Sequence, residues 1–381
     1  TERPLVFADN DLPGIMLTSA ISTYLGRFAI VPGANVVLAT TNDSAYDVAE
    51  QLVEAGCEVR VIDARPATSA RSQHAIDQGI AVDVGHALVQ ASGEQHVERA
   101  LVAALDEDGQ PVSETVTLTA DVVGLSGGWS PVVHLHSQRQ GSSRWDAVLG
   151  GFVPVPDVRA QALAGAVCGS YATGLCIREG SAAGRWAASQ EPEAMSAAVT
   201  DTERDHACGP VRELWAVPSP DHTWDTHFVD LHRDNTVADV LRALGAGMRN
   251  IEHVKRYTSI GTGADQGKTG NVVTSGLIAR LLREGTDPTA GLGRPTGPGD
   301  IGTTTARAPY TPVAFAALAG RYRGDLLDPA RHTACHSWHV ARGALFEDVG
   351  QWKRPWFYPQ DGEDMAAAVA RECRAVRENV G

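Results

Sequence analysis

The sequence predicts an α/β protein, and three consecutive stretches support that prediction. A continuous apolar run, NVVLAT (residues 35–40), is typical of a buried strand. Residues 42–56 begin with a cluster of capping residues and end at Gly56, which is typical of a helix. CEVRVIDA (57–64) again has the composition of a strand. Strand, helix and strand joined by short connections favour a parallel sheet.

The neighbouring stretches extend this α/β pattern in both directions. Before the first strand, residues 15–27 have helical periodicity. After the second strand, residues 80–107 alternate between apolar and polar in the way typical of a β-meander. We predict a short strand with a glycine turn over residues 162–170, and a helix that follows it from Tyr171.

Further along the chain the composition changes. A weakly periodic stretch with Pro, Glu and Trp indicates a linker across the surface. It precedes two short predicted helices, joined near Gly245–Gly247, and a third helix over residues 271–284. We therefore predict a nucleotide-binding domain over residues 1–190, a linker over 191–225, a small helical domain over 226–300 and the start of a further domain over 301–381.

Composition excludes several classes of protein. The 381 residues are 43% hydrophobic and 20% charged, which allows a sizeable core and argues against disorder. A net charge of -14 disfavours nucleic acid as a partner. No apolar stretch of membrane-spanning length and no signal peptide is found, so we predict no membrane partner. The six cysteines form no CxxC pair, which favours a cytoplasmic protein without disulfides or a metal site.

Two glycine-related motifs do not match the nucleotide-binding patterns that they first suggest. In SIGTGADQGKTGN (259–271), Gly263 is separated from Gly267 by three residues, whereas a P-loop needs four, so we exclude a nucleotide triphosphatase. The turn after the first strand, TTNDSA, has no glycine that would let the backbone approach a pyrophosphate. We interpret residues 35–64 as structural and expect Asp63 at the surface.

Two histidines stand close together in VVHLHS. On a strand, His134 and His136 would share one face, as metal ligands do. No third ligand is near them in the sequence, so we interpret them as loop or packing histidines.

The order of elements over residues 1–190 resembles the pyridine-nucleotide–disulfide reductase superfamily, which has an FAD/NAD(P)-binding fold. The resemblance implies an inserted second nucleotide domain followed by the returning end of the first. In AGAVCGSYATGL, this returning end has the family's Ala-Gly pair and helix but not its acidic residue. The G-x-G-x-x-G of the first domain is absent from the chain. The resemblance implies that Ala166, Tyr171 and Thr173 lie near NAD.

HVKRYTSIGTGADQGKTGN, together with DLHRDNTVADVLRAL, resembles a bacterioferritin-associated-ferredoxin-like (BFD-like) domain. In that family four cysteines hold a [2Fe–2S] cluster. The corresponding positions here are occupied by residues without a thiol: Asp230, His232, Asp265 and Gly270. The resemblance therefore implies a cysteine-less BFD-like helical domain that lacks the cluster and has its loop free for another ligand.

The C-terminal stretch, HTACHSWHVARGALFEDVGQWKRPWFYP, resembles the start of the aminomethyltransferase (glycine-cleavage T-protein) fold. Residues His339, Trp352 and Pro355 fit that pattern. His332 and His336 precede His339 at spacings of four and three, which would place the three side chains on one helical face. The resemblance implies that they are structural rather than metal ligands.

The three parts in this order resemble the alpha subunit of heterotetrameric sarcosine oxidase, over essentially the whole chain. The chain opens without Met, so we expect it to be a piece of a longer polypeptide, and the resemblance implies that it is the middle of that subunit. The resemblance implies oxidation of sarcosine to glycine, with oxygen reduced to hydrogen peroxide and the methyl carbon transferred to tetrahydrofolate as 5,10-methylenetetrahydrofolate. It implies NAD in the alpha subunit, FAD in the beta subunit, FMN between the two, and tetrahydrofolate in a domain beyond residue 381. Gamma and delta subunits are further implied partners.

With this resemblance, the loop becomes a candidate site for the FMN phosphate. The donors that we assign to it are Lys255, Arg256, Gln266, Lys268 and Thr269. In the alternative interpretation, the basic pair at 255–256 only complements a helix dipole.

Two other functions stay open at this point. The first is a related amine, opine or proline dehydrogenase alpha subunit, but such subunits usually keep the cluster cysteines and lack the folate domain. The second is a non-catalytic scaffold that binds NAD and docks the beta subunit. The sequence contains no complete nucleophile–base constellation, so no catalytic residue is assigned.

Overall fold

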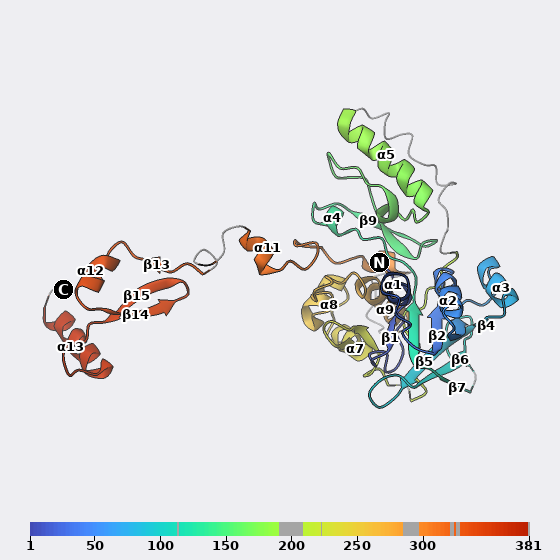
Figure 1. Ribbon diagram of the computed structural model, residues 1–381, viewed down its shortest axis with the longest axis horizontal. Coiled ribbons are helices and arrows are strands. Elements are labelled where there is room, and N and C mark those ends of the chain that lie inside the picture. The colour runs from blue at the N-terminus through green and yellow to red at the C-terminus, as the bar shows by residue number, and fades with distance from the viewer. Residues whose placement is uncertain are drawn as a thin grey trace. The chain divides into compact units, whose positions relative to one another are not determined.

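The computed structural model describes residues 1–112, 114–189, 209–221, 223–284, 297–320, 324 and 328–379. They form two compact units, residues 1–311 and residues 312–381, and each is described by itself (Figure 1).

A five-stranded parallel sheet forms the centre of the first unit, which confirms the predicted α/β class. All neighbouring strands in it are parallel. β8, which comes last of the five in the chain, lies between the two that come first, β1 and β2. In spatial order the strands are β1 (Ile15–Leu17), β8 (Val122–Ser126), β2 (Asn35–Thr40), β3 (Glu58–Asp63) and β4 (Ala81–Val84).

The two faces of this sheet contribute to different cores, because successive side chains of a strand point to opposite faces. Val36 and Leu38 of β2 pack with the helices, and the neighbouring Val37 and Ala39 pack with a second sheet. The helices are α1 (Thr18–Phe28), α2 (Ser44–Glu54) and α3 (Ala70–Asp77). The second sheet is antiparallel and consists of β5 (His86–Ser92), β6 (Arg99–Ala104) and β7 (Val116–Thr119).

Two predicted elements therefore need correction. The stretch 15–27 is a short strand, β1, followed by a helix, because its first residues pair with β8. The predicted meander over 80–107 is also divided: β4 joins the parallel sheet beside β3, and only β5 and β6 belong to the antiparallel sheet.

The returning segment contains α4 (His134–Ser137), the hairpin of β9 (Ser143–Asp146) and β10 (Gly151–Pro154), the 3₁₀ turn η1 (Gly165–Cys168) and α5 (Thr173–Ser189). The predicted strand over 162–170 is wrong. Gly165 and Gly169 have φ of 75° and 85°, which an extended strand does not allow. The buried Glu179 carboxylate accepts hydrogen bonds from Gly165 N (2.5 Å) and Ser170 Oγ (2.5 Å), and so holds the turn from inside.

The three predicted helices after the linker are present. They are α7 (Val237–Gly245), α8 (Ile251–Thr258) and α9 (Asn271–Glu284), preceded by a small hairpin of β11 (Phe228–Asp230) and β12 (Asn235–Thr236) and followed by α10 (Pro298–Ile301). Their core includes Val6, Phe152 and Trp215 from outside this segment. The helical segment thus shares a core with the rest of the first unit. Of the predicted linker, residues 191–208 and 222 lie outside the described residues, and the four predicted domain ranges stay a prediction.

The second unit is small. It contains α11 (Phe315–Ala319), α12 (His336–Ala341), α13 (Met365–Glu378) and a sheet in the order β13 (Arg331–His332), β15 (Trp352–Phe357) and β14 (Leu345–Val349). Large apolar side chains such as Trp338, Trp352 and Trp356 are about half exposed, and only Ala344, Phe357 and Ala368 are buried among its described apolar residues.

Candidate functional site

The carboxyl edge of the parallel sheet, where doubly wound folds bind dinucleotides, holds a cluster of charges. Asp63, at the end of β3, is fully buried, so the expectation that it lies at the surface is wrong. It accepts a hydrogen bond from Tyr46 Oη (2.6 Å) and pairs with Arg65 (2.7 Å). Arg65 also pairs with Asp43 (2.7 Å), at the start of α2. Burial and the neighbouring Asp63 carboxylate raise the pKa of Tyr46 well above its ordinary value.

Arg212 and Gly209 make further contacts at this edge. Arg212 donates its backbone N–H to Thr41 O (3.0 Å) and its guanidinium to Ala64 O (2.6 Å). A side chain at Gly209 would meet the Asp43 carboxylate, since a Cβ there would lie 2.1 Å from Oδ2. The segment 209–212 therefore covers the edge, which supports the interpretation of residues 35–64 as structural.

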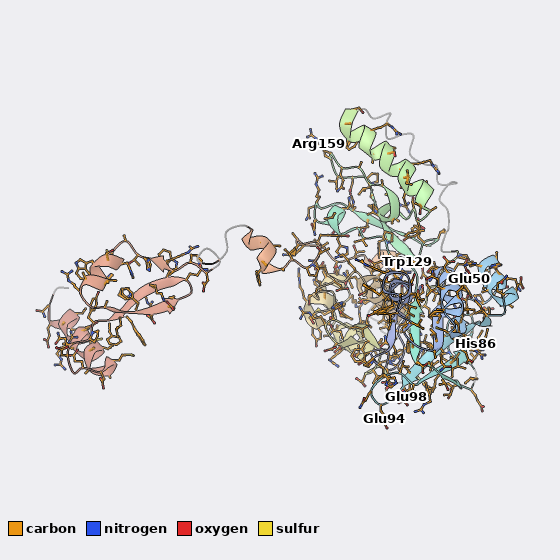
Figure 2. The ribbon with its side chains drawn as sticks, in the orientation of Figure 1. Glu50, His86, Glu94, Glu98, Trp129 and Arg159 are labelled. Atoms are coloured by element: carbon orange, nitrogen blue, oxygen red, sulfur yellow. The ribbon has the colours of Figure 1, made fainter. Side chains whose placement is uncertain are left out.

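A cavity of about 490 Å³ lies at the returning segment. It contains two of the three residues predicted near NAD, Ala166 and Tyr171. Thr173, the exposed first residue of α5, is outside its lining. The ring centroids of Tyr171 and Trp129 are 6.4 Å apart. Trp129 is labelled in Figure 2. Aromatic walls suit a planar ring. The principal lining residues are Trp129, Gln161, Leu163, Ala166, Tyr171 and Tyr310.

Two carboxylates organise the loop that we assign to FMN. Asp265 accepts hydrogen bonds from Gly267 N (3.0 Å), Thr269 N (3.2 Å) and Thr269 Oγ1 (2.7 Å). Asp230 accepts from Gly261 N (2.7 Å) and from the backbone N–H of the residue two positions on. Two of the four positions that match cluster cysteines are thus bonded to donors of the loop itself, and the Thr269 hydroxyl is engaged inside the loop.

The same contacts set the ionisation of Asp265. Its burial alone would raise the pKa, but the hydrogen bonds from Thr269 and Gly267 outweigh that effect and hold the pKa below its ordinary value. The loop donors therefore face a carboxylate that stays ionised. No thiolate is present at these positions, and the donor set does not fit an iron–sulfur cluster.

The cationic residues assigned to FMN differ in their partners. Lys268 Nζ donates to Tyr310 O (2.6 Å) and lies 4.7 Å from the centroid of the Tyr310 ring. Burial lowers the pKa of Lys268. Lys255 and Arg256 lie in the last turn of α8, and within the described residues neither side chain has a hydrogen-bond or ion-pair partner. These two positive charges are therefore available to an anion such as the phosphate of the predicted FMN.

Gln266 connects the loop to its surroundings. Its backbone has φ of 55°, its side-chain amide donates to Pro309 O, and its carbonyl accepts a hydrogen bond from His134 Nε2 (3.1 Å). Because a carbonyl only accepts, Nε2 carries the proton and Nδ1 is left as an acceptor.

His134 is the residue that the sequence interpretation undervalued. It lies in the short helix α4 rather than on a strand, and its buried Nδ1 has no partner in the described chain. Burial lowers its pKa, and the nearby Lys268 and Lys255 act in the same direction. With Lys268 and Asn271 it lines a second cavity of about 40 Å³. His136, in contrast, bonds on both ring nitrogens and packs as expected.

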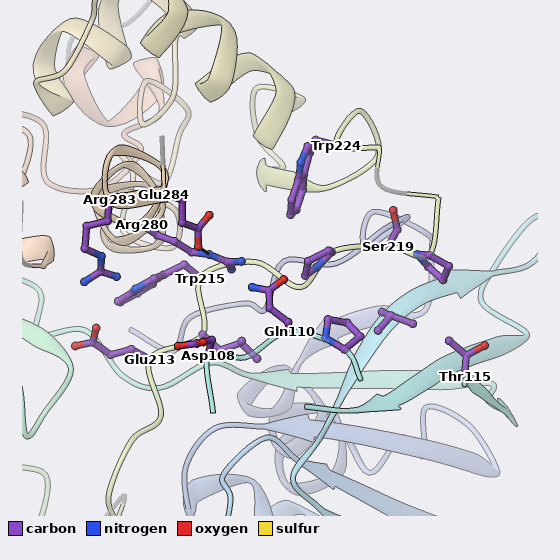
Figure 3. Close-up of a pocket in the computed structure, with 15 residues that line it drawn as sticks. Asp108, Gln110, Thr115, Glu213, Trp215, Ser219, Trp224, Arg280, Arg283 and Glu284 are labelled. Carbon is purple, nitrogen blue, oxygen red and sulfur yellow. Dashed lines mark hydrogen bonds and ion pairs between the residues drawn. The ribbon is translucent and has the colours of Figure 1, made fainter. Parts of the chain in front are cut away.

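A larger cavity, of about 1050 Å³, lies at the end of α9 (Figure 3). None of the predicted cofactor residues lines it. Trp215 and Trp224 stand along it, and Arg280 comes from the helix. Arg280 donates to Glu284 (2.8 Å) and to Ala216 O (2.7 Å), so its charge is already partnered. We place the candidate site at the smaller cavities, because three of the predicted residues, Ala166, Tyr171 and Lys268, line them.

The histidines of the second unit do not share a helical face. His332 belongs to β13, whereas His336 and His339 lie in α12, so that expectation is wrong. The rings of His332 and His336 stack at 3.9 Å, and His339 Nδ1 hydrogen-bonds to Tyr358 Oη. In the part of the chain that the structure describes, no group of three His, Cys, Asp or Glu residues is placed to hold a metal ion.

Among the described helices, none has both the length and the apolar character needed to span a bilayer.

The fold of this chain is shared with a solved dehydrogenase. Among solved structures, the chain is similar to an L-proline dehydrogenase from P. horikoshii, with a TM-score of 0.56 and 17% identity, covering 84% of this chain and 56% of that one. Residues 224–321 match the sarcosine oxidase A3 domain, and residues 335–381 match the GCVT N-terminal domain. The second match confirms the predicted start of an aminomethyltransferase-like fold.

Curated relatives give a more specific similarity. The chain is 49% identical over 394 residues to the sarcosine oxidase subunit alpha of Corynebacterium sp. (strain P-1), and 51% identical over 396 residues to that of strain U-96. Both matches cover 100% of this chain and 39% of the relative. The chain is thus related over its whole length to sarcosine oxidase alpha subunits and spans about two fifths of their length, which confirms the resemblance inferred from its sequence.

Proposed function

We propose that this chain acts within the alpha subunit of a sarcosine oxidase, which oxidises sarcosine to glycine with oxygen as the electron acceptor and tetrahydrofolate as the acceptor of the one-carbon unit. The observation that carries this proposal is the identity of 49–51% over the whole chain to subunits of that name. The GCVT N-terminal match at residues 335–381 supports a folate domain. Beta, gamma and delta subunits are the proposed partners, and the cytoplasm is the proposed compartment.

Within that subunit we assign two cofactor sites to this chain. NAD lies near Ala166, Tyr171 and Thr173, where the aromatic cavity and the start of α5 provide a surface for a ring and a helix N-terminus for a phosphate. The subunit partner, beta, holds FAD. Residues 1–381 contain no G-x-G-x-x-G to hold the pyrophosphate, so we expect them alone to bind NAD weakly.

The second site is for FMN, shared with the beta subunit. When bound, FMN supplies the two-electron chemistry that delivers electrons to oxygen. The role of this chain is to balance the phosphate charge and to hold the ligand in place. Lys255 and Arg256 have no ion-pair partner among the described residues, and Lys268 retains one N–H donor beyond its two bonds to carbonyls. Gln266 and Thr269 complete the assigned set.

One observation favours a second function, that of a non-catalytic NAD-binding scaffold. The N–H groups of Gly267 and Thr269, and the Thr269 hydroxyl, are all bonded to Asp265. A loop satisfied in this way can persist without an external ligand. The dehydrogenase alternative is less supported, since the proline dehydrogenase similarity is one of fold at 17% identity.

The test is made in the assembled complex with the variants Lys268→Ala and Arg256→Ala. Loss of one charge-assisted hydrogen bond costs about 1.5–3 kcal/mol, which is roughly ten- to a hundredfold in affinity. We expect weaker FMN retention or slower electron transfer to oxygen, with FAD reduction by sarcosine almost intact, in stopped-flow absorbance. Arg242→Ala is the control, because that exposed arginine already pairs with Asp239 on α7. Wild-type transfer in both variants would support the scaffold instead.

The donor set at the loop gives a separate expectation about metal content. With Asp230 and Asp265 engaged by backbone N–H groups and no thiol present, the purified complex should contain no iron–sulfur cluster. Iron and acid-labile sulfide in stoichiometric amounts would contradict the assignment of this loop.

A further inference from the structure

Tyr310 lies between the two proposed cofactor sites and belongs to both. Its side chain lines the 490 Å³ cavity that contains Ala166 and Tyr171. Its carbonyl accepts the hydrogen bond from Lys268 Nζ (2.6 Å), and its ring lies 4.7 Å from the same ammonium. A cation over an aromatic face is attracted by the ring, so both parts of Tyr310 hold Lys268.

The segment that carries Tyr310 is attached to its surroundings by hydrogen bonds at four other residues. Thr304 Oγ1 accepts one from the Asn271 side chain (2.6 Å), and Thr305 N donates one to Glu252 (2.6 Å). Residues 303–310 form no helix or strand. The preceding Pro309 accepts a hydrogen bond from the Gln266 side chain, and Ala306 N donates to Ser137 Oγ (3.1 Å). Tyr310 itself is 37% exposed. A side chain with this much freedom responds to a ligand more readily than one buried in a core.

We infer that Tyr310 couples the two sites: an aromatic ring bound in the cavity, the nicotinamide end of a dinucleotide, packs against Tyr310 and thereby fixes the position of the Lys268 ammonium at the flavin loop. This inference rests on the proposed function, because it takes NAD and FMN as the ligands. It assigns NAD a role as an effector of the flavin site, at a residue outside the sets assigned to either cofactor.

A second connection runs in parallel through the chain at residues 134–136. Leu135 and His136 line the 490 Å³ cavity, and His134 donates a hydrogen bond to Gln266 O (3.1 Å) in the loop. Here the cavity and the loop are contacted by different side chains. Tyr310 is a single residue that both lines the cavity and contacts the cation, and it is therefore the one to change.

Coupling between two sites is reciprocal, so NAD must alter the flavin site by the factor with which the flavin site alters NAD binding. In the assembled holoenzyme, NAD titration of the wild type should shift the FMN absorption spectrum. Tyr310→Ala should abolish this shift and weaken NAD binding roughly tenfold in calorimetry, the size of an aromatic contact. Tyr310→Phe keeps the ring and the carbonyl and should behave as wild type. Tyr257→Ala removes an exposed tyrosine from α8, outside the cavity lining, and should change neither quantity.

The outcomes separate the inference from the proposed function. If the wild-type complex binds no NAD, the proposed NAD site fails and the coupling fails with it. If NAD binds but leaves the wild-type flavin spectrum unchanged, the inference alone is overturned, and this holds even if the Tyr310→Ala protein does not assemble. Retention of the full spectral shift in Tyr310→Ala overturns it as well.

Discussion

Related folds hold a ligand at two places, which correspond here to the carboxyl edge of the parallel sheet and the loop at residues 259–271. In each of them, acidic side chains of this chain bind the nearby donors. At the sheet edge, Asp63 and Asp43 bind Arg65. In the loop, Asp265 and Asp230 bind backbone N–H groups. Both replacements satisfy donors that would otherwise lack partners.

The two regions differ in the charges that remain. At the edge the cation is inside the cluster, where the Arg65 side chain is 5% exposed, and the segment 209–212 covers it. At the loop the nearest cations of α8, Lys255 and Arg256, have no partner in the described chain. A cluster whose charges pair with one another is therefore interpreted as structural. Positive charges without a partner, beside a loop whose backbone donors are already hydrogen-bonded, indicate a site that can bind an anion.

The largest expected effect belongs to the sheet edge. Arg65→Ala leaves the fully buried Asp63 without its cation, and breaking a buried ion pair in this way costs about 3–5 kcal/mol of unfolding free energy. Urea denaturation at neutral pH measures the loss. The matched control is Arg60→Ala, which breaks an exposed pair with Asp83 and should cost at most about 1 kcal/mol. Equal losses in the two variants would show that the edge is not a buried structural cluster.

A smaller effect is expected at the loop from Asp265→Asn. The amide has only one acceptor atom for three donors, and because Asp265 is only half-buried we expect a loss of about 1–2 kcal/mol. Since the native pKa lies below the ordinary value of about 4, the stabilisation is complete above that value and is lost as pH falls through the native pKa. The difference between wild type and variant in urea denaturation should therefore shrink below about pH 4. A difference independent of pH would show that Asp265 is not ionised in the native loop.

The smallest expected effect is that of Ser69→Ala. Ser69 Oγ accepts a hydrogen bond from Ser72 N (3.1 Å) as the N-cap of α3, and donates one to Asp43 (2.6 Å). Loss of such a cap costs about 1 kcal/mol. Thermal denaturation of the variant compares this attachment with the ion pair of Arg65. A loss as large as that of Arg65→Ala would mean that the hydroxyl, rather than the guanidinium, holds the edge together.

Local pattern was sufficient to predict the elements whose neighbours in sequence determine them. The strand over 35–40 has the predicted bounds, and the helices that follow the linker lie where their periodicity indicated. Capping residues and period give these elements without knowledge of the rest of the fold.

The rest depended on partners that are distant in sequence. Asp63 was expected at the surface because its sequence neighbours do not reveal Asp43, which is brought to it by the fold. The turn at Gly165 depends on Glu179, fourteen residues later. At the candidate site, Lys268 was predicted from its charge, but its contact with Tyr310, 42 residues away, has no local signal. Spatial proximity of this kind is information that a single sequence does not contain.

The position of β8 has a consequence for how the chain is made. Among the described strands, β1 pairs only with β8, and β2 pairs with β8 on one of its two sides. During synthesis, a chain that has emerged as far as residue 121 therefore carries an unpaired first strand and an open edge on an apolar second one. Such edges invite pairing with other chains. The five buried residues Val122–Ser126 pair with both exposed strand edges. The sheet can therefore form only after these residues have left the ribosome, and until then its edges can pair with other chains.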